Sequence, residues 1–240
     1  MPADKTADTT PDAATVDHFG PVSVTQADGV ATVLVDSPPV NAMGEAVLEG
    51  LRAAAEVVSA AARDVRAVVL TGGGSKAFMA GADISEFSDL AADPDGMRRH
   101  SVAARATFDA WQALPHPLIA AVQASAVGGG LEIALVCDLI VADPTARFGL
   151  PEVKLGLIPG GGGTLRLPDR IGVAAAKELL LLGSVVDAER AATLGLINRV
   201  SAPGQALFEA RALAERIAAL PWVAVSSVKR AVDGGLDVLT

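Results

Sequence analysis

The chain has 240 residues, of which 51% are hydrophobic, 20% charged and only 3% aromatic, with no tyrosine. This composition excludes a disordered chain, and the scarcity of aromatic side chains argues against a surface that stacks bases or sugars. The net charge of −9 argues against nucleic acid as a partner, because binding to a phosphate backbone needs a basic face.

The N-terminal residues 1–17 alternate small polar and acidic side chains, and we expect them to form a flexible tail without a signal peptide. Residues 18–240 show no break in composition, which predicts a single domain. The chain has one cysteine and three histidines that are far apart in the sequence, so we expect neither a disulfide nor a metal site. No apolar run is long enough to span a bilayer. These features predict a cytoplasmic protein without membrane contact.

The first elements alternate apolar and small or polar residues. The runs 22–26 and 30–35 flank Asp28-Gly29, a dipeptide typical of a tight hairpin turn. Residues 45–62 have apolar side chains at helical spacing, and so do residues 97–114, which end before Pro115. Short apolar runs at 67–71, 118–122 and 139–142 predict buried strands.

The C-terminal third predicts mainly helices after Leu165, with extended pieces at 185–186 and 198–201. Strands, glycine-bearing loops and helices recur along the chain in that order. This order predicts an α/β fold whose sheets are covered by helices.

The cluster Gly72-Gly73-Gly74, followed by Ser75-Lys76-Ala77, resembles a dinucleotide-binding loop in its glycine spacing. The residues that follow do not open a helix, and no acidic residue ends a second strand about 20 residues later. The sequence therefore favours an ordinary loop over a nucleotide site.

A second cluster, Gly128-Gly129-Gly130, directly precedes an apolar helix that contains Glu132. Glycines at this place let a ligand or another segment approach the backbone near outward-pointing N–H groups. Glu132 has two equally weighted interpretations. It complements the helix dipole, or it is buried with a raised pKa and acts as an acid or base.

A third cluster places Glu152 directly after Pro151 and ahead of the glycines 160–163. A glutamate in the first turn of a helix is commonly a capping residue, and on the residues alone we favour this role for Glu152. The glycines form a loose loop, or they clear space for a substrate beside Glu152.

A fourth element, residues 80–86, places Asp83 and Glu86 in the spacing of a capping box. The backbone N–H of Ala82 would then lie just before a helix. Together with the N–H of Gly129 it could converge on one carbonyl oxygen as an oxyanion hole.

These segments, in this order, resemble the enoyl-CoA hydratase/isomerase family, the crotonases. The resemblance covers roughly residues 20 to 235 and rests on six segments in register: 39–43 (PVNAM), 76–84 (KAFMAGADI), 128–138 (GGGLEIALVCD), 148–153 (FGLPEV), 155–164 (LGLIPGGGGT) and 192–197 (ATLGLI).

The resemblance implies a spiral of ββα units with a helical C-terminal part, assembled as a homotrimer or homohexamer. It implies an acyl-CoA thioester substrate and no cofactor or metal. The oxyanion-hole donors would be the amides of Ala82 and Gly129, and the catalytic residues Glu132 and Glu152. Further substrate contacts fall on the positions Lys76, Ala80, Gly81, Asp83, Ile84 and Gly160.

The presence of both glutamates favours hydration of a trans-2-enoyl-CoA to the 3-hydroxyacyl-CoA, as in β-oxidation. Glu132 would orient and activate the water, and Glu152 would handle the proton at C2. Two alternatives remain: a Δ3-Δ2-enoyl-CoA isomerase of the same fold, and a non-catalytic acyl-CoA-binding subunit. Two departures from the family bear on CoA binding, namely a shorter helical segment at the C-terminus and Ser85 where relatives often have a basic residue.

Overall fold

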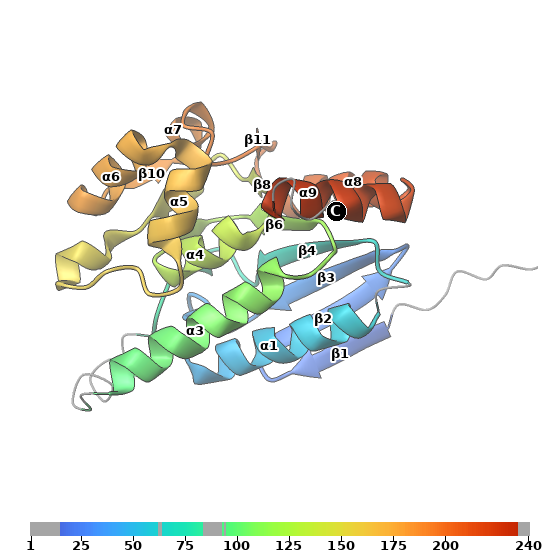
Figure 1. The fold of residues 1–240 in the computed structure, drawn as a ribbon, viewed down its shortest axis with the longest axis horizontal. Coiled ribbons are helices and arrows are strands. Elements are labelled where there is room, and N and C mark those ends of the chain that lie inside the picture. The colour runs from blue at the N-terminus through green and yellow to red at the C-terminus, as the bar shows by residue number, and fades with distance from the viewer. Residues whose placement is uncertain (1–14, 62–63, 84–92, 94, 235–240) are drawn as a thin grey trace, which may run out of the picture.

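The computed structural model describes residues 15–61, 64–83, 93 and 95–234. It contains a seven-stranded sheet and a four-stranded sheet, with helices packed on them (Figure 1). None of the helices within these residues is long and apolar enough to cross a membrane.

The seven-stranded sheet has the order β1-β2-β3-β4-β6-β8-β11. The first three strands are antiparallel neighbours, and every pairing from β3 onward is parallel. The strands are β1 (Thr15–Phe19), β2 (Val22–Ala27), β3 (Val30–Val35), β4 (Ala67–Gly72), β6 (Leu118–Val122), β8 (Leu139–Ala142) and β11 (Arg199–Val200).

The four-stranded sheet consists of short strands that each follow a strand of the large sheet or a helix. Its order is β10-β9-β7-β5, with parallel β5, β7 and β9 and an antiparallel edge strand β10. The strands are β5 (Ala77–Met79), β7 (Ser125–Val127), β9 (Arg147–Gly149) and β10 (Val185–Asp187). The chain therefore repeats one step three times: it leaves the large sheet after β4, β6 and β8 and enters the small sheet at β5, β7 and β9.

Helices cover both faces of the large sheet, and α4 and α7 pack on the small one. The helices are α1 (Glu45–Ala60), α3 (Gly96–Gln112), α4 (Gly129–Val136), the 3-10 helix η1 (Pro151–Leu155), α5 (Gly163–Ile171), α6 (Val173–Leu182), α7 (Ala188–Thr193), α8 (Ala206–Ala218) and α9 (Trp222–Gly234). Helix α1 packs on β1–β3 and on α3, whereas α8 packs on β3, β4, β6 and β8.

The residues of β4 show why the large sheet needs cover on both sides. Val68 and Leu70 belong to the core beneath α1, whereas Ala67 and Val69 belong to a second core beneath α8. An uninterrupted apolar run is the pattern expected of a parallel strand that is buried on both faces.

The predicted elements are largely confirmed, including the turn at Asp28-Gly29, where both residues have positive φ. The boundary of the tail is different: β1 begins at Thr15, so residues 15–17 belong to the sheet and not to the flexible tail. Strand β1 is mostly exposed, and it therefore lacks the apolar alternation by which the other strands were predicted.

Candidate active site

Glu132 lies in the first turn of α4, and glycines determine where this helix can sit. A β-carbon on Gly130 would lie 1.9 Å from the carbonyl oxygen of Met79, so only glycine lets α4 pack this closely against the end of β5. Gly128 precedes the helix with a φ of +55°, and its N–H donates to the carbonyl of Gly149 at 2.9 Å. The first turn of α4 is thereby fixed between β5 and β9.

The Glu132 side chain is 4% exposed and faces the loop that leads into α5. The N–H of Gly163 donates to Glu132 Oε1 at 2.8 Å, and a β-carbon on Gly161 would lie 2.9 Å from Glu132 Oε2. Burial raises the pKa of Glu132, while the amides of this loop and the charge of Arg166 act in the opposite direction. Of the two interpretations, the structure supports the buried carboxyl with a raised pKa.

Glu152 follows Pro151 in η1, and its environment differs from that of a simple capping residue. Glu152 Oε1 lies close to Gly128, where a β-carbon would be 3.3 Å away. Glu152 Oε2 is buried and has no hydrogen-bond partner within the described residues. Burial raises the pKa of Glu152 to about 7, and the neighbouring charge of Glu132 contributes to the rise. The charge of Glu132 thus reaches Glu152, and both glutamates lie at the start of α4.

The segment with Ala82 lies against the start of α4. Met43 forms a parallel bridge with Ala82, and its N–H donates to the carbonyl of Gly81 at 2.7 Å. A β-carbon on Gly81 would lie 3.5 Å from the backbone nitrogen of Gly129. The two amides predicted as oxyanion donors therefore belong to segments in contact.

Within the described residues, neither of these amides donates to a backbone carbonyl. Gly129 is the first residue of α4, so its N–H has no acceptor within the helix. Among the backbone hydrogen bonds between described residues, none is donated by Ala82. Two such donors beside buried carboxyls are suited to holding an oxygen that gains negative charge.

Two further polar side chains, Asn41 and Gln123, hold the loop and strand before Ala82 by hydrogen bonds. Asn41 Nδ2 donates to the carbonyls of Gly73, Ala77 and Phe78 at 2.9–3.1 Å. Gln123 Nε2 donates to the carbonyls of Gly72 and Ala77 at 2.8 and 3.0 Å. In the sequence, Asn41 is the polar residue of the segment PVNAM, and Gln123 directly follows the apolar strand 118–122. These two positions were the signals from which a structural role could have been predicted.

The other predicted contact residues are spread around this centre. Ala80 is tied to Val40 by its N–H, and Asp83 is half-buried beside Ala82. Gly160 is exposed and lies against Ser101 of α3. Ile84 and the predicted cap Glu86 lie outside the described residues.

Lys76 is separated from the two amides by a strand. It is exposed and precedes β5, whereas Ala82 follows β5. Lys76 therefore stays a predicted substrate contact at the exposed start of β5.

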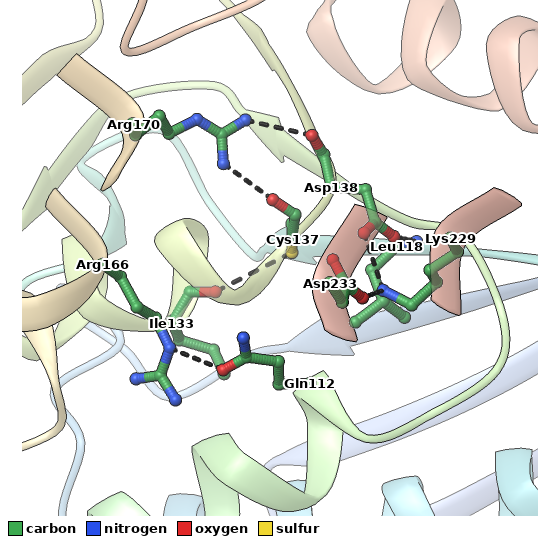
Figure 2. Close-up of polar contacts among 9 residues, drawn as sticks. All are labelled: Gln112, Leu118, Ile133, Cys137, Asp138, Arg166, Arg170, Lys229 and Asp233. Carbon is green, nitrogen blue, oxygen red and sulfur yellow. Dashed lines mark hydrogen bonds and ion pairs between the residues drawn. The ribbon is translucent and has the colours of Figure 1, made fainter. Parts of the chain in front are cut away.

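A cavity of about 1030 Å³ lies elsewhere, between the end of α4 and helices α5, α8 and α9. Figure 2 shows its polar wall, in which Arg170 donates to the carbonyls of Cys137 and Asp138, and Lys229 pairs with Asp138 and Asp233. Neither glutamate is among its lining residues. In the part of the chain that the structure describes, no cluster of three His, Cys, Asp or Glu side chains is arranged to hold a metal ion.

Comparison with known proteins gives consistent matches over nearly the whole chain. A model described as enoyl-CoA hydratase/isomerase matches residues 25–239. The chain is 40% identical to a short-chain-enoyl-CoA hydratase of Clostridium acetobutylicum over 174 residues, which are 72% of this chain and 66% of that protein. It is also 40% identical to a crotonyl-CoA hydratase of Syntrophomonas wolfei over 173 residues, with the same coverage. The matches span just under two thirds of the length of these two relatives.

Solved structures confirm the predicted crotonase-like fold. An enoyl-CoA hydratase from Bacillus anthracis superposes with a TM-score of 0.84 and 35% identity, covering 93% of this chain and 83% of that one. DspI of Pseudomonas aeruginosa gives a TM-score of 0.87 at 35% identity, covering 92% and 83%. The chain therefore belongs to the enoyl-CoA hydratase/isomerase family.

Proposed function

We propose that this protein hydrates trans-2-enoyl-CoA thioesters to 3-hydroxyacyl-CoA. The observation that carries the proposal is the placement of Glu132 and Glu152 beside the amides of Ala82 and Gly129, which donate to no backbone acceptor within the described residues. Relatives that are called hydratases support the same activity.

The thioester oxygen would bind between the two amides. Addition at C3 makes the thioester an enolate, and its negative charge develops on this oxygen. Two oriented N–H dipoles stabilise the charge where it forms, and losing one such donor typically costs about 3 kcal/mol of barrier. The CoA part provides remote binding energy that holds the thioester in place.

The two carboxyls differ in a way that suits an acid and a base. Burial raises the pKa of Glu132, but the hydrogen bond from the N–H of Gly163, the other loop amides and the charge of Arg166 oppose this rise and favour the ionised form. Glu152 has a buried oxygen without a hydrogen-bond partner in the described part of the chain, and burial raises its pKa to about 7, so that a large fraction of it keeps its proton at neutral pH. We therefore assign water activation to Glu132 and protonation of C2 to Glu152.

The proposed step balances with one water molecule and one substrate molecule. The water oxygen bonds to C3 as its proton passes to Glu132, and the proton of Glu152 passes to C2. The pair is left with its proton on Glu132 instead of Glu152. Transfer between these coupled groups restores the starting state.

Isomerisation is the second candidate, since the unpartnered oxygen of Glu152 could also move one proton between C2 and C4. Glu132→Gln separates the two reactions. Hydration of crotonyl-CoA, followed by the loss of its conjugated absorbance, should fall by about 10²- to 10⁴-fold, the usual contribution of a general base. Isomerisation of a 3-enoyl-CoA that relies on Glu152 should largely survive.

The results of this assay decide between the candidates. Undiminished hydration by the Glu132→Gln variant would contradict the water-activating role. Binding of crotonyl-CoA without turnover by the unaltered protein would favour a non-catalytic acyl-CoA-binding subunit.

The setting of the reaction is part of the same proposal. The chemistry needs no metal or redox cofactor, because the carboxyls and amides supply every proton transfer and charge contact. We place the reaction in the β-oxidation of fatty acids in the cytoplasm, carried out by a homotrimer or homohexamer.

A further inference from the structure

Arg166 is a largely covered arginine on α5 whose guanidinium turns back over the loop that holds Glu132. Its side chain is 11% exposed. Nη1 donates to the carbonyl of Gly161 at 2.7 Å, and a β-carbon on Gly162 would lie 2.3 Å from Nη1. The guanidinium therefore packs directly on the backbone of residues 161–162.

The same guanidinium is anchored on α3 by two further bonds. Nε donates to Gln112 Oε1 at 2.8 Å, as Figure 2 shows, and Nη2 donates to Asp109 Oδ1 at 2.5 Å. Each of its three nitrogens thus has an acceptor of its own. A planar fork with three fixed acceptors holds one orientation, which a lysine ammonium on a flexible stem does not reproduce.

The loop held in this way is the one that contacts Glu132. Gly161 and Gly163 flank Glu132 Oε2 and Oε1, and Gly163 lies two residues beyond the carbonyl that Arg166 binds. The positive charge of Arg166 also acts on the carboxyl, opposing the effect of burial on its pKa. The charged groups around this point include Glu152 on η1 and, on α3, Asp109 with its second partner Arg105.

We propose that Arg166 is a positioning residue for hydration: it ties the loop 161–163 to α3 and so keeps Glu132 in place and in its water-activating state. This inference rests on the proposed function for its effect on the reaction. The hydrogen bonds of Arg166 to Gly161, Asp109 and Gln112, which we call the clamp, do not depend on the reaction. Their effect on Glu132 can therefore be measured without turnover.

The test compares Arg166→Met and Arg166→Lys with a matched control, Arg105→Met. Arg105 pairs with the other oxygen of Asp109 and is 45% exposed. In Arg166→Met we expect kcat for crotonyl-CoA hydration to fall about 10- to 100-fold, the effect of a small displacement of a catalytic group. KM should stay within about threefold, because the clamp acts on the chemical step.

The discriminating readout is the titration of the Glu132 carboxyl, followed by NMR of protein labelled at glutamate carboxyl carbons. The Glu132 signal is the one that disappears in Glu132→Gln. Its midpoint should move upward in Arg166→Met, because a positive charge is lost. It should stay in place in Arg166→Lys, which keeps the charge and recovers only part of kcat, and in Arg105→Met.

An unmoved Glu132 titration in Arg166→Met would overturn the inference, even if the variant were less stable or less active. If Arg166→Met does not fold, Arg166→Lys decides. A kcat equal to that of the unaltered protein would overturn the inference, whereas a partly reduced kcat with an unchanged Tm would support it. An unaltered protein that turns over no enoyl-CoA would refute the proposed function alone, since the titration judges the clamp independently.

Discussion

Burial makes the carboxyl of Glu152 a weaker acid than a carboxyl in water, and this affects the stability of the fold. Its pKa in the folded protein is about 7, against a model value of 4.5. Because the folded value is the higher one, the group contributes stability below about pH 4.5, and this contribution is lost as the pH rises through 7. An acid suited to proton transfer therefore destabilises the protein that contains it under alkaline conditions.

Glu152→Gln tests this relation. A neutral amide removes the ionisation, so the variant should exceed the unaltered protein in unfolding free energy at pH 8 by about 1–2 kcal/mol, because solvent screening reduces the full 1.36 kcal/mol per pKa unit. The difference should disappear near pH 4. Denaturant unfolding at the two pH values measures it, and an equal difference at both would show that ionisation of Glu152 is not its source.

At the same scale, the sequence predicted roles for Glu132 and Glu152 but did not decide whether Glu132 is buried. Glu132 is buried because α4 packs against the loop before α5, 31 residues further on. A sequence pattern around α4 contains no information on this distant contact. Arg166 was missed for the same reason, since its partners Asp109 and Gln112 lie more than 50 residues away.

Among the elements, the short helix α4 depends on Gly130 for its position against β5. In Gly130→Ala the added methyl would meet the backbone oxygen of Met79, so the helix or the strand must shift. We expect a loss of unfolding free energy of about 1–3 kcal/mol, as for other overpacked sites. Because the same shift moves the Gly129 amide and Glu132, hydration activity should fall as well.

Thermal unfolding and kcat of Gly130→Ala check this prediction together. A variant with unchanged stability and unchanged kcat would show that the close approach of α4 and β5 does not set the geometry of the site.

The sequence predicted well those elements that depend on residues close together in the chain. The hairpin of β2 and β3 follows from Asp28-Gly29, and β6 and β8 follow from apolar runs between turns. The strands of the small sheet were predicted less well, because β5, β7 and β9 have three residues each and no alternation can be recognised over that length. Their pairing is decided by the tertiary structure.

On the scale of the whole molecule, apolar side chains remain exposed on two helices of the C-terminal third, α6 and α9. On α9, Val223, Val228 and Val232 are 64–78% exposed, and on α6 Leu181 and Leu182 are 62–72% exposed. Such side chains are typical of surfaces that bury against a partner. This pattern supports the proposed assembly into a homotrimer or homohexamer.

Sedimentation equilibrium measures the assembly directly. We expect three or six times the mass of the chain, and a smaller mass for a double variant Val228→Glu, Val232→Glu if α9 lies in the contact. A monomer over the accessible concentration range would contradict the proposed assembly.

The central claim concerns where the acyl group binds and what surrounds it. A crystal structure with an unreactive analogue of crotonyl-CoA tests it most directly. We predict that the thioester oxygen lies about 2.7–3.1 Å from the nitrogens of both Ala82 and Gly129, the range of such donors, with a water molecule between Glu132 and Glu152. An acyl group bound in the cavity between α4, α5, α8 and α9, away from both glutamates, would contradict the account.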